Sequence, residues 1–196
     1  MKVDLREAVT GGRGRVWILA GAVAVACVGF LHLPERSLAQ TPSGKDVVAP
    51  TAYVSLDPAG RGSKAQIAVV MKIRPGFHVN AREKSAEYLI ATDLKSEVPA
   101  GFSAGEVAYP KGKLEKFVFS KTPLNVYQDT VVLKVPVTVL ATAPTGQQHI
   151  PMKLRYQACS QEICLPPVTL NVDALINVAA SASASRPVHP EIFKMP

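Results

Sequence analysis

Apolar residues from position 52 onward recur in short runs with a period close to two, and Gly, Pro, Asp and Asn separate these runs. Because side chains alternate between the two faces of a β-strand, the pattern predicts strands that bury one face. No stretch of the sequence has a sustained helical period with capping residues. The predicted strands span residues 52–56, 65–73, 77–80, 87–92, 102–109, 124–127, 130–140, 148–157 and 168–172.

The number and spacing of these strands predict the fold class. Roughly eight or nine short strands within about 120 residues are typical of an all-β, immunoglobulin-like β-sandwich. Clusters of Pro and Gly at 57–60, 74–76 and 143–146 supply the turns. Pro136 interrupts the strand predicted at 130–140, and proline has no backbone N–H to donate to a sheet. We therefore expect an edge or a bulge at that position.

The first 39 residues have the features of an export segment. A basic leader precedes an apolar run at 16–33, and the small residues Ser37 and Ala39 fit a signal-peptidase site. The apolar run is about as long as the shortest membrane spans, so residues 1–39 are either a signal peptide or an N-terminal membrane anchor. Either outcome places the rest of the chain in an extracytoplasmic, oxidising compartment, where disulfides persist.

The remaining chain divides into three parts by composition. Residues 40–50 are polar and flanked by proline, which is typical of a linker. Residues 51–176 contain the predicted strands and form one domain. Residues 177–196 begin with alternating Ala and Ser, and they contain so little apolar surface that we expect a disordered tail.

Composition and charge narrow the function classes. A chain of 196 residues with 47% apolar residues can bury the core of one ordinary domain. The net charge is +7, but the low aromatic content and the lack of a base-stacking or helix-turn-helix pattern argue against a nucleic-acid partner. The four histidines have no metal-ligand spacing, so we expect no metal and no other cofactor. A copper or zinc site built from two thiols and His78 is a minor alternative.

Cys159 and Cys164 are the two cysteines that lie outside the export segment. The four residues between them have the length of a hairpin loop, which would place the two cysteines opposite each other on antiparallel strands. Opposed residues have Cα atoms about 4.5–5.5 Å apart, a distance that a disulfide can bridge. The spacing therefore permits a disulfide without a backbone rearrangement.

Strand parity and loop length bear on what this disulfide does. Met152, Leu154 and Tyr156 share one face of the preceding strand, so if that face is buried, Cys159 lies on the polar face and the pair is partly accessible. A structural disulfide is the alternative. In the chain-entropy model so short a loop contributes only about 2 kcal/mol, against more than about 4 kcal/mol for a bridge that spans most of the domain. Spacing and parity leave a redox-active pair and a structural disulfide both open.

The segment around the cysteines resembles the active-site segment of the N-terminal periplasmic domain of the thiol:disulfide interchange protein DsbD. Supporting similarities lie at 75–80, 87–92, 109–113 and 117–119, and the resemblance covers about residues 48–175. The specific part of the resemblance is the motif Tyr156-Gln157-x-Cys159-x4-Cys164-x-Pro166-Pro167.

The resemblance implies unequal roles for the two cysteines. Cys164 would form a mixed disulfide with a partner protein, and Cys159 would resolve it. An aromatic cap loop, here 114–120, would shield the pair through Phe117 or Phe119. The family has aromatic residues beside the pair, and His78 and Asn80 stand at those positions in this sequence.

The resemblance also implies partners and a function. The chain would be a periplasmic protein that passes reducing equivalents to or from thioredoxin-fold or other periplasmic redox proteins, with a membrane electron donor as a further partner. We expect a thiol:disulfide oxidoreductase of the protein-disulfide reductase type. The sequence has no Cys-x-x-Cys motif, so the chain would either receive electrons from a separate protein or have given up that role. The alternative from another class is a secreted, non-enzymatic binding module with a structural disulfide.

Overall fold

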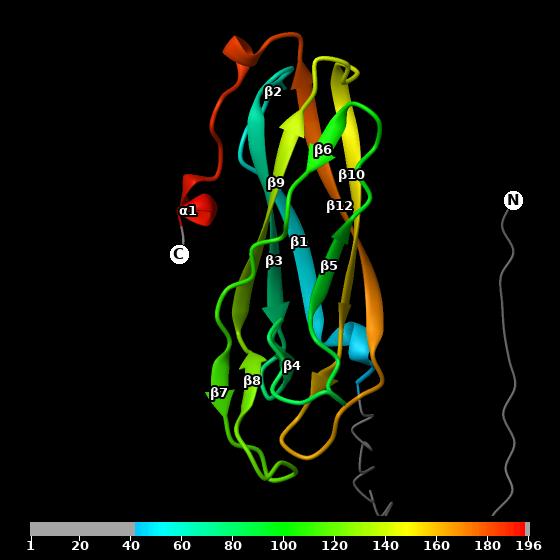
Figure 1. Ribbon diagram of the computed structural model, residues 1–196, viewed down its shortest axis with the longest axis vertical. Helices are drawn as coiled ribbons and strands as arrows, with labels where there is room; N and C mark the ends of the chain where they lie inside the picture. The colour runs from blue at the N-terminus through cyan, green and yellow to red at the C-terminus, as the bar shows by residue number, and fades with distance from the viewer. Residues whose placement is uncertain (1–41, 195–196) are drawn as a thin grey trace, which may run out of the picture. The chain divides into compact units, whose positions relative to one another are not determined.

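The long strands pack as two sheets that face each other across one apolar core (Figure 1). This computed structural model describes residues 42–194. One sheet has the order β1-β3-β9-β6 and the other has the order β2-β12-β10-β5. The all-β, immunoglobulin-like sandwich predicted from the sequence is confirmed. The first sheet contains β1 (Val48–Val54), β3 (Lys64–Ile73), β9 (Thr130–Val139) and β6 (Phe102–Ala104), and the second contains β2 (Ala59–Gly60), β12 (Val168–Ala179), β10 (Gly146–Tyr156) and β5 (Asp93–Ser96).

A third, smaller sheet extends the sandwich at one end. It has the order β11-β4-β8-β7, and it carries the strand of Cys159 and the loop between β7 and β8 that contains Phe117 and Phe119 (Figure 1). Short strands joined by longer loops leave this end less regular than the sandwich, which is common where a scaffold presents a functional site. The strands are β4 (His78–Asn80), β7 (Lys113–Glu115), β8 (Leu124–Tyr127) and β11 (Ala158–Cys159).

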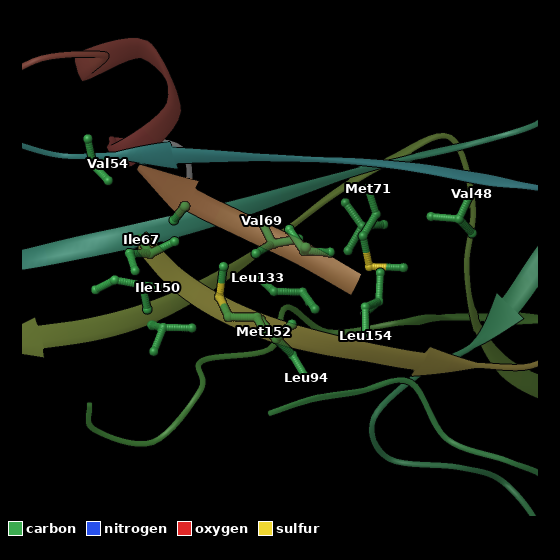
Figure 2. Packing of buried hydrophobic residues seen from close by; sticks show 14 of the residues in the cluster. Val48, Val54, Ile67, Val69, Met71, Leu94, Leu133, Ile150, Met152 and Leu154 are labelled. Carbon is green, nitrogen blue, oxygen red and sulfur yellow. The ribbon is translucent and has the colours of Figure 1, made fainter. Parts of the chain in front are cut away.

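The core is built by the alternation that the sequence predicts. Along β10, Ile150, Met152, Leu154 and Tyr156 are buried, and the residues between them are exposed or half-buried. Their side chains meet those of β3 and β9, and Figure 2 shows this packing between the strands. The residues of β3 and β9 that contribute to this core are Ile67, Val69, Met71, Leu133, Val135, Val137 and Val139.

Pro136 lies in β9 at the point where the neighbouring strand β6 ends. β9 is an internal strand, but β6 pairs only with its last residues, from Val137 to Val139. The carbonyl of Pro136 accepts a hydrogen bond from Gly105 N–H (2.9 Å), just beyond the end of β6. Pairing resumes only at the bridge between Ala108 and Lys134. The missing N–H of proline therefore coincides with a break in the ladder rather than with an edge strand.

The strand predicted at 87–92 is wrong, and the strand is instead β5, which begins at Asp93. Asn80 explains the difference. Its Nδ2 atom donates to the Ile90 carbonyl (3.1 Å), and its own carbonyl accepts from Thr92 N–H (3.1 Å). The backbone of this segment is thus held by Asn80 instead of by a sheet ladder, and residues 81–92 form a loop.

The prediction of a disordered tail from residue 177 is also wrong: residues 177–194 are ordered. β12 continues to Ala179, where it pairs with β2. The chain then returns past the end of β1, and it adds two short helices, η2 (Ala182–Ala184) and α1 (Pro190–Phe193). Asp57 N–H donates to the Arg186 carbonyl (2.9 Å), and Val188 N–H donates to the Ser55 carbonyl (3.0 Å). Composition misses this order because Val178 is the one residue of the segment in the main core, and hydrogen bonds hold much of the rest.

The domain begins earlier than the predicted boundary at residue 51. A short helix, η1 (Gly44–Asp46), precedes β1 inside the segment predicted as a linker at 40–50. The prediction of a signal peptide or membrane anchor at 1–39 lies outside the described residues. Between residues 42 and 194, no helix is long and apolar enough to cross a membrane.

Candidate redox site

The chain changes sheets at Gln157, directly before the first cysteine. Tyr156 is still a core residue of β10, and its hydroxyl donates to the Gly44 carbonyl (2.7 Å), which ties η1 to the sandwich. Burial raises the pKa of Tyr156 to about 12. Gln157 Nε2 donates to the Leu165 carbonyl (3.3 Å), which links the two arms of the cysteine hairpin. Tyr156 therefore supports the site from the core, and Gln157 holds together the two arms of the cysteine hairpin.

This change of sheet overturns one expectation about Cys159. The sequence placed Cys159 on the polar face of the preceding strand, but only 1% of it is exposed. β11 leaves the sheet of β10 and pairs with β4 instead, so the alternation of β10 does not continue through Gln157. Parity arguments hold only within one continuous strand, and this strand ends at Tyr156.

Cys159 and Cys164 form a disulfide across the predicted hairpin. The two residues pair as an antiparallel bridge, and their Cα atoms are 3.9 Å apart, closer than the distance expected from the sequence. Ser160 N–H donates to the Ile163 carbonyl (2.8 Å), and Leu165 N–H donates to the Ala158 carbonyl (2.8 Å). The backbone closes the hairpin through these two hydrogen bonds, on either side of the disulfide.

The two bridged cysteines differ in exposure. Cys159 is buried, whereas Cys164 is exposed, as are Ile163 before it and Pro166 after it. A thiol that approaches from solvent therefore meets Cys164 and not Cys159. This asymmetry gives the two sulfur atoms different access to a partner.

His78 is the residue directly opposite Cys159 on β4. All three residues of β4 are buried, and the Nε2 atom of His78 is buried without a hydrogen-bond partner among the described residues. Burial lowers the pKa of His78 to about 4, so its imidazole is neutral at pH 7. Asn80, two residues further along, is buried too and braces the 81–92 loop rather than the disulfide.

The predicted cap loop lies between β7 and β8, at the same end of the molecule as the cysteine hairpin (Figure 1). Phe117 stacks on His78, with ring centroids 3.9 Å apart and an angle of 21° between the ring planes. Phe119 lies further out, with its centroid 5.4 Å from that of Phe117 and 6.4 Å from that of His78. Phe117 is 4% exposed and Phe119 is 40% exposed. Phe117 is thus the inner ring of a stack that continues through Phe119 towards solvent.

The base of this loop is a small apolar cluster that sequence reasoning missed. Phe117 packs with Leu89, Leu124 and Val126, and this cluster is separate from the main core. Leu89 lies in the segment that the sequence predicted as a strand, so its role under the loop was hidden. Leu89 lies in the short apolar run Tyr88-Leu89-Ile90-Ala91, which is equally typical of a strand, so the sequence offers no separate signal for this role.

A cavity of about 280 Å³ opens beside His78, and sequence reasoning missed this feature as well. Its lining comes from two turns that are far apart in the sequence, 74–77 and 128–129, together with Gln161 of the hairpin. Turn residues carry no periodicity, so nothing in the sequence brings them together. The described residues contain no group of three or more His, Cys, Asp or Glu side chains placed to hold a metal ion.

Comparison with protein families finds a match to the N-terminal domain of the thiol:disulfide interchange protein DsbD, over residues 45–175. Comparison with curated protein sequences finds no match. Among solved structures, the N-terminal periplasmic domain of ScsB from Proteus mirabilis is similar, with a TM-score of 0.44 and 16% sequence identity. The match covers 67% of this chain and 48% of that chain, so this chain spans about half the length of that relative.

A second solved structure with some similarity is AggA, the major subunit of aggregative adherence fimbriae type I from Escherichia coli. Its TM-score is 0.28 and its sequence identity is 10%, and the match covers 67% of this chain and 95% of that chain.

Proposed function

This chain belongs to the family of the N-terminal domain of the thiol:disulfide interchange protein DsbD, and we propose that it exchanges disulfides with partner proteins through Cys159 and Cys164. It would act outside the cytoplasm as a thiol:disulfide oxidoreductase of the protein-disulfide reductase type. The single observation that carries the proposal is the asymmetry of the bridged pair, in which Cys164 is exposed and Cys159 is buried under an aromatic stack.

The asymmetry assigns an order to the steps. In the reduced protein, the Cys164 thiolate attacks one sulfur of the partner's disulfide, and the partner's other sulfur leaves as a thiolate that takes up a proton. Cys159 then loses its proton and attacks the Cys164 sulfur. The Cys159–Cys164 bond forms, the bond to the partner breaks, and the partner leaves as a dithiol. Two electrons pass to the partner, and the reverse sequence carries them the other way.

The geometry of the hairpin favours exchange over a structural role. Backbone hydrogen bonds from Ser160 and Leu165 already close the hairpin on both sides of the disulfide. The disulfide therefore restricts the unfolded chain over a loop of only a few residues, which is worth about 2 kcal/mol in the chain-entropy model. A non-enzymatic binding module with a structural disulfide is the competing function, and it gives no reason for the unequal exposure of the two cysteines.

The aromatic loop would shield Cys159, the buried member of the pair, in an oxidising compartment. Phe117 covers His78, which lies opposite Cys159, and Phe119 extends the cover outward. We assign Phe117 as the inner shielding ring and Phe119 as the outer one. Displacement of this loop by a docked partner would uncover Cys159, so the resolving step would follow only where a partner is bound.

The electrons would be exchanged with thioredoxin-fold or other periplasmic redox proteins, or with a membrane electron donor. These partners follow from the chemistry of the pair, because a protein whose own disulfide has an accessible sulfur is what an exposed Cys164 can attack. The exposed residues Val118 and Ile163 lie on the two loops that such a partner would touch.

Trapping of mixed disulfides tests the proposal. Reduced Cys159→Ser and Cys164→Ser variants are mixed with oxidised thioredoxin, and the covalent adducts are quantified on non-reducing gels. Cys159→Ser should accumulate an adduct through Cys164, because the resolving thiol is missing, and Cys164→Ser should accumulate little. Equal adduct from both variants would overturn the assigned roles. No adduct from either variant, also with glutathione disulfide as the oxidant, would overturn the exchange function itself.

A further inference from the structure

We propose that His78 stabilises the reduced form of the pair by donating a hydrogen bond to the sulfur of Cys159. The inference rests on the proposed function, because it concerns the redox equilibrium of the same two cysteines. His78 takes no part in the exchange steps between Cys164, Cys159 and a partner.

The strand register places the imidazole beside the sulfur. His78 and Cys159 are paired directly across the antiparallel β4–β11 ladder. Residues opposite each other in such a ladder project to the same face, with Cβ atoms about 4.5–5.5 Å apart. The register therefore brings the imidazole and the cysteine sulfur to the same face of the small sheet.

The Nε2 atom of His78 lacks a partner when the disulfide is formed. It is buried, and no hydrogen bond to it is found among the described residues. A buried polar atom without a partner is unfavourable, and such atoms are rare enough to require an explanation. Phe117 covers one face of the ring, so a partner for Nε2 must approach the ring edge.

Reduction provides that partner. A disulfide sulfur is a poor hydrogen-bond acceptor, whereas a thiolate is a strong one. Reduction adds two electrons and two protons to the Cys159–Cys164 bond and yields two thiols. Loss of the Cys159 proton to solvent then gives a thiolate, to which Nε2–H of the neutral imidazole can donate. The hydrogen bond exists only after the disulfide opens, so it shifts the equilibrium towards the reduced pair.

Charged residues lie on the turns, the cap loop and the hairpin that adjoin His78. Arg74 and Asp129 line the cavity beside His78, Lys116 precedes Phe117 in the cap loop, and Glu162 lies in the hairpin. Burial is the cause of the lowered pKa of His78, and these groups do not contribute to it. A neutral ring acts on the thiolate as a hydrogen-bond donor rather than as a counter-ion.

Two variants separate this role from packing. His78→Phe keeps an aromatic ring for the stack on Phe117 but removes the nitrogen, and His78→Gln restores an N–H donor at a similar distance from the backbone. Tyr127→Phe is the matched control. It removes a hydroxyl that donates to the Pro110 carbonyl (2.8 Å) from a buried aromatic residue of the same sheet, and it leaves His78 intact.

The equilibrium of each folded variant with glutathione is measured together with the pKa of Cys159, the latter from thiolate absorbance in a Cys164→Ser background. His78→Phe should lower the equilibrium constant for reduction by about tenfold, which corresponds to a potential about 30 mV lower. The same change should raise the Cys159 pKa by about one unit. His78→Gln should recover part of both effects, and Tyr127→Phe should change neither.

An equilibrium constant for His78→Phe within about twofold of the unchanged protein, or equal shifts for Phe and Gln, would overturn the inference. These outcomes are separate from a failure of the proposed function. A structural disulfide would show itself in the unchanged protein by a very low potential and by a lack of exchange with thioredoxin, whatever the variants do.

Discussion

Phe117 stacks on His78 with ring centroids 3.9 Å apart, and His78 in turn is the cross-strand partner of Cys159. The exposed loop between β7 and β8 is thereby connected to the buried cysteine through a single imidazole ring. The arrangement accounts for the burial of Cys159 in a hairpin whose other cysteine is exposed.

The first prediction concerns the two phenylalanines of the loop. Phe117→Ala should accelerate the oxidation of the reduced pair by a small oxidant more than Phe119→Ala does, because Phe117 is the inner, buried ring. It should also cost about 3 kcal/mol of stability, against less than about 1 kcal/mol for Phe119→Ala. Loss of free thiol over time in dilute peroxide measures the rates. The exposed Tyr88 supplies a control, since Tyr88→Ala should leave the rate unchanged.

The opposite order of rates would make Phe119 the principal shield, and unchanged rates in both variants would remove the shielding role from this loop.

The second prediction concerns acid stability. The pKa of His78 is lowered from 6.5 to about 4 in the fold, so the unfolded chain binds the proton more readily. The contribution of His78 to stability is complete above about pH 6.5 and is lost as the pH falls towards 4, by at most about 1.4 kcal/mol per pH unit. Urea unfolding at a series of pH values measures this slope. His78→Phe should have a flatter profile across that interval, and an identical slope in both proteins would contradict the prediction.

The third prediction concerns Tyr156, which supports the site from the core. Tyr156→Phe removes the hydroxyl that donates to the Gly44 carbonyl (2.7 Å) and leaves that carbonyl without this donor. The free energy of unfolding should fall by about 1–3 kcal/mol. The redox equilibrium with glutathione should not change, because the hydroxyl is bonded to η1 and not to either cysteine. A changed equilibrium with unchanged stability would place Tyr156 in the redox site instead.

The fourth prediction concerns the C-terminal segment. The amides of Asp57 and Val188 should exchange slowly with deuterated solvent, because each donates a backbone hydrogen bond between the segment and the end of β1. Removal of residues 180–196 should increase the exchange rate at Asp57, whose acceptor is the Arg186 carbonyl. Rapid exchange at Asp57 in the full chain would show that the segment does not hold this position.

Much of the fold follows from the sequence because the strands of the sandwich are regular. The alternation from Ile150 to Tyr156 fixes which face of β10 is buried, and the four residues between the cysteines fix the hairpin. Both features depend on local properties, the hydrophobic period and the loop length, which can be read directly from the sequence.

The parts that could not be predicted depend on tertiary contacts. The burial of Cys159 follows from a change of sheet at Gln157, and the hydrophobic periodicity of the sequence does not predict this change. The burial of Phe117, and not of Phe119, follows from packing against Leu89, a residue 28 positions earlier in the chain. Asn80, on β4, donates to the Ile90 carbonyl and holds the segment predicted as a strand at 87–92 in a loop instead. In each case a side chain or strand from a distant segment decides the outcome over local propensity.

The most direct test of the central claim, that Cys159 and Cys164 are a redox-active pair, is the reduction potential of the disulfide in the folded chain. It is obtained from equilibria with glutathione and, at lower potentials, with dithiothreitol, by following the ratio of dithiol to disulfide. An exchange protein should have a potential above about −300 mV, within reach of thioredoxin-fold partners. A potential well below about −300 mV, together with no exchange with such a partner, would identify a structural disulfide and contradict the account.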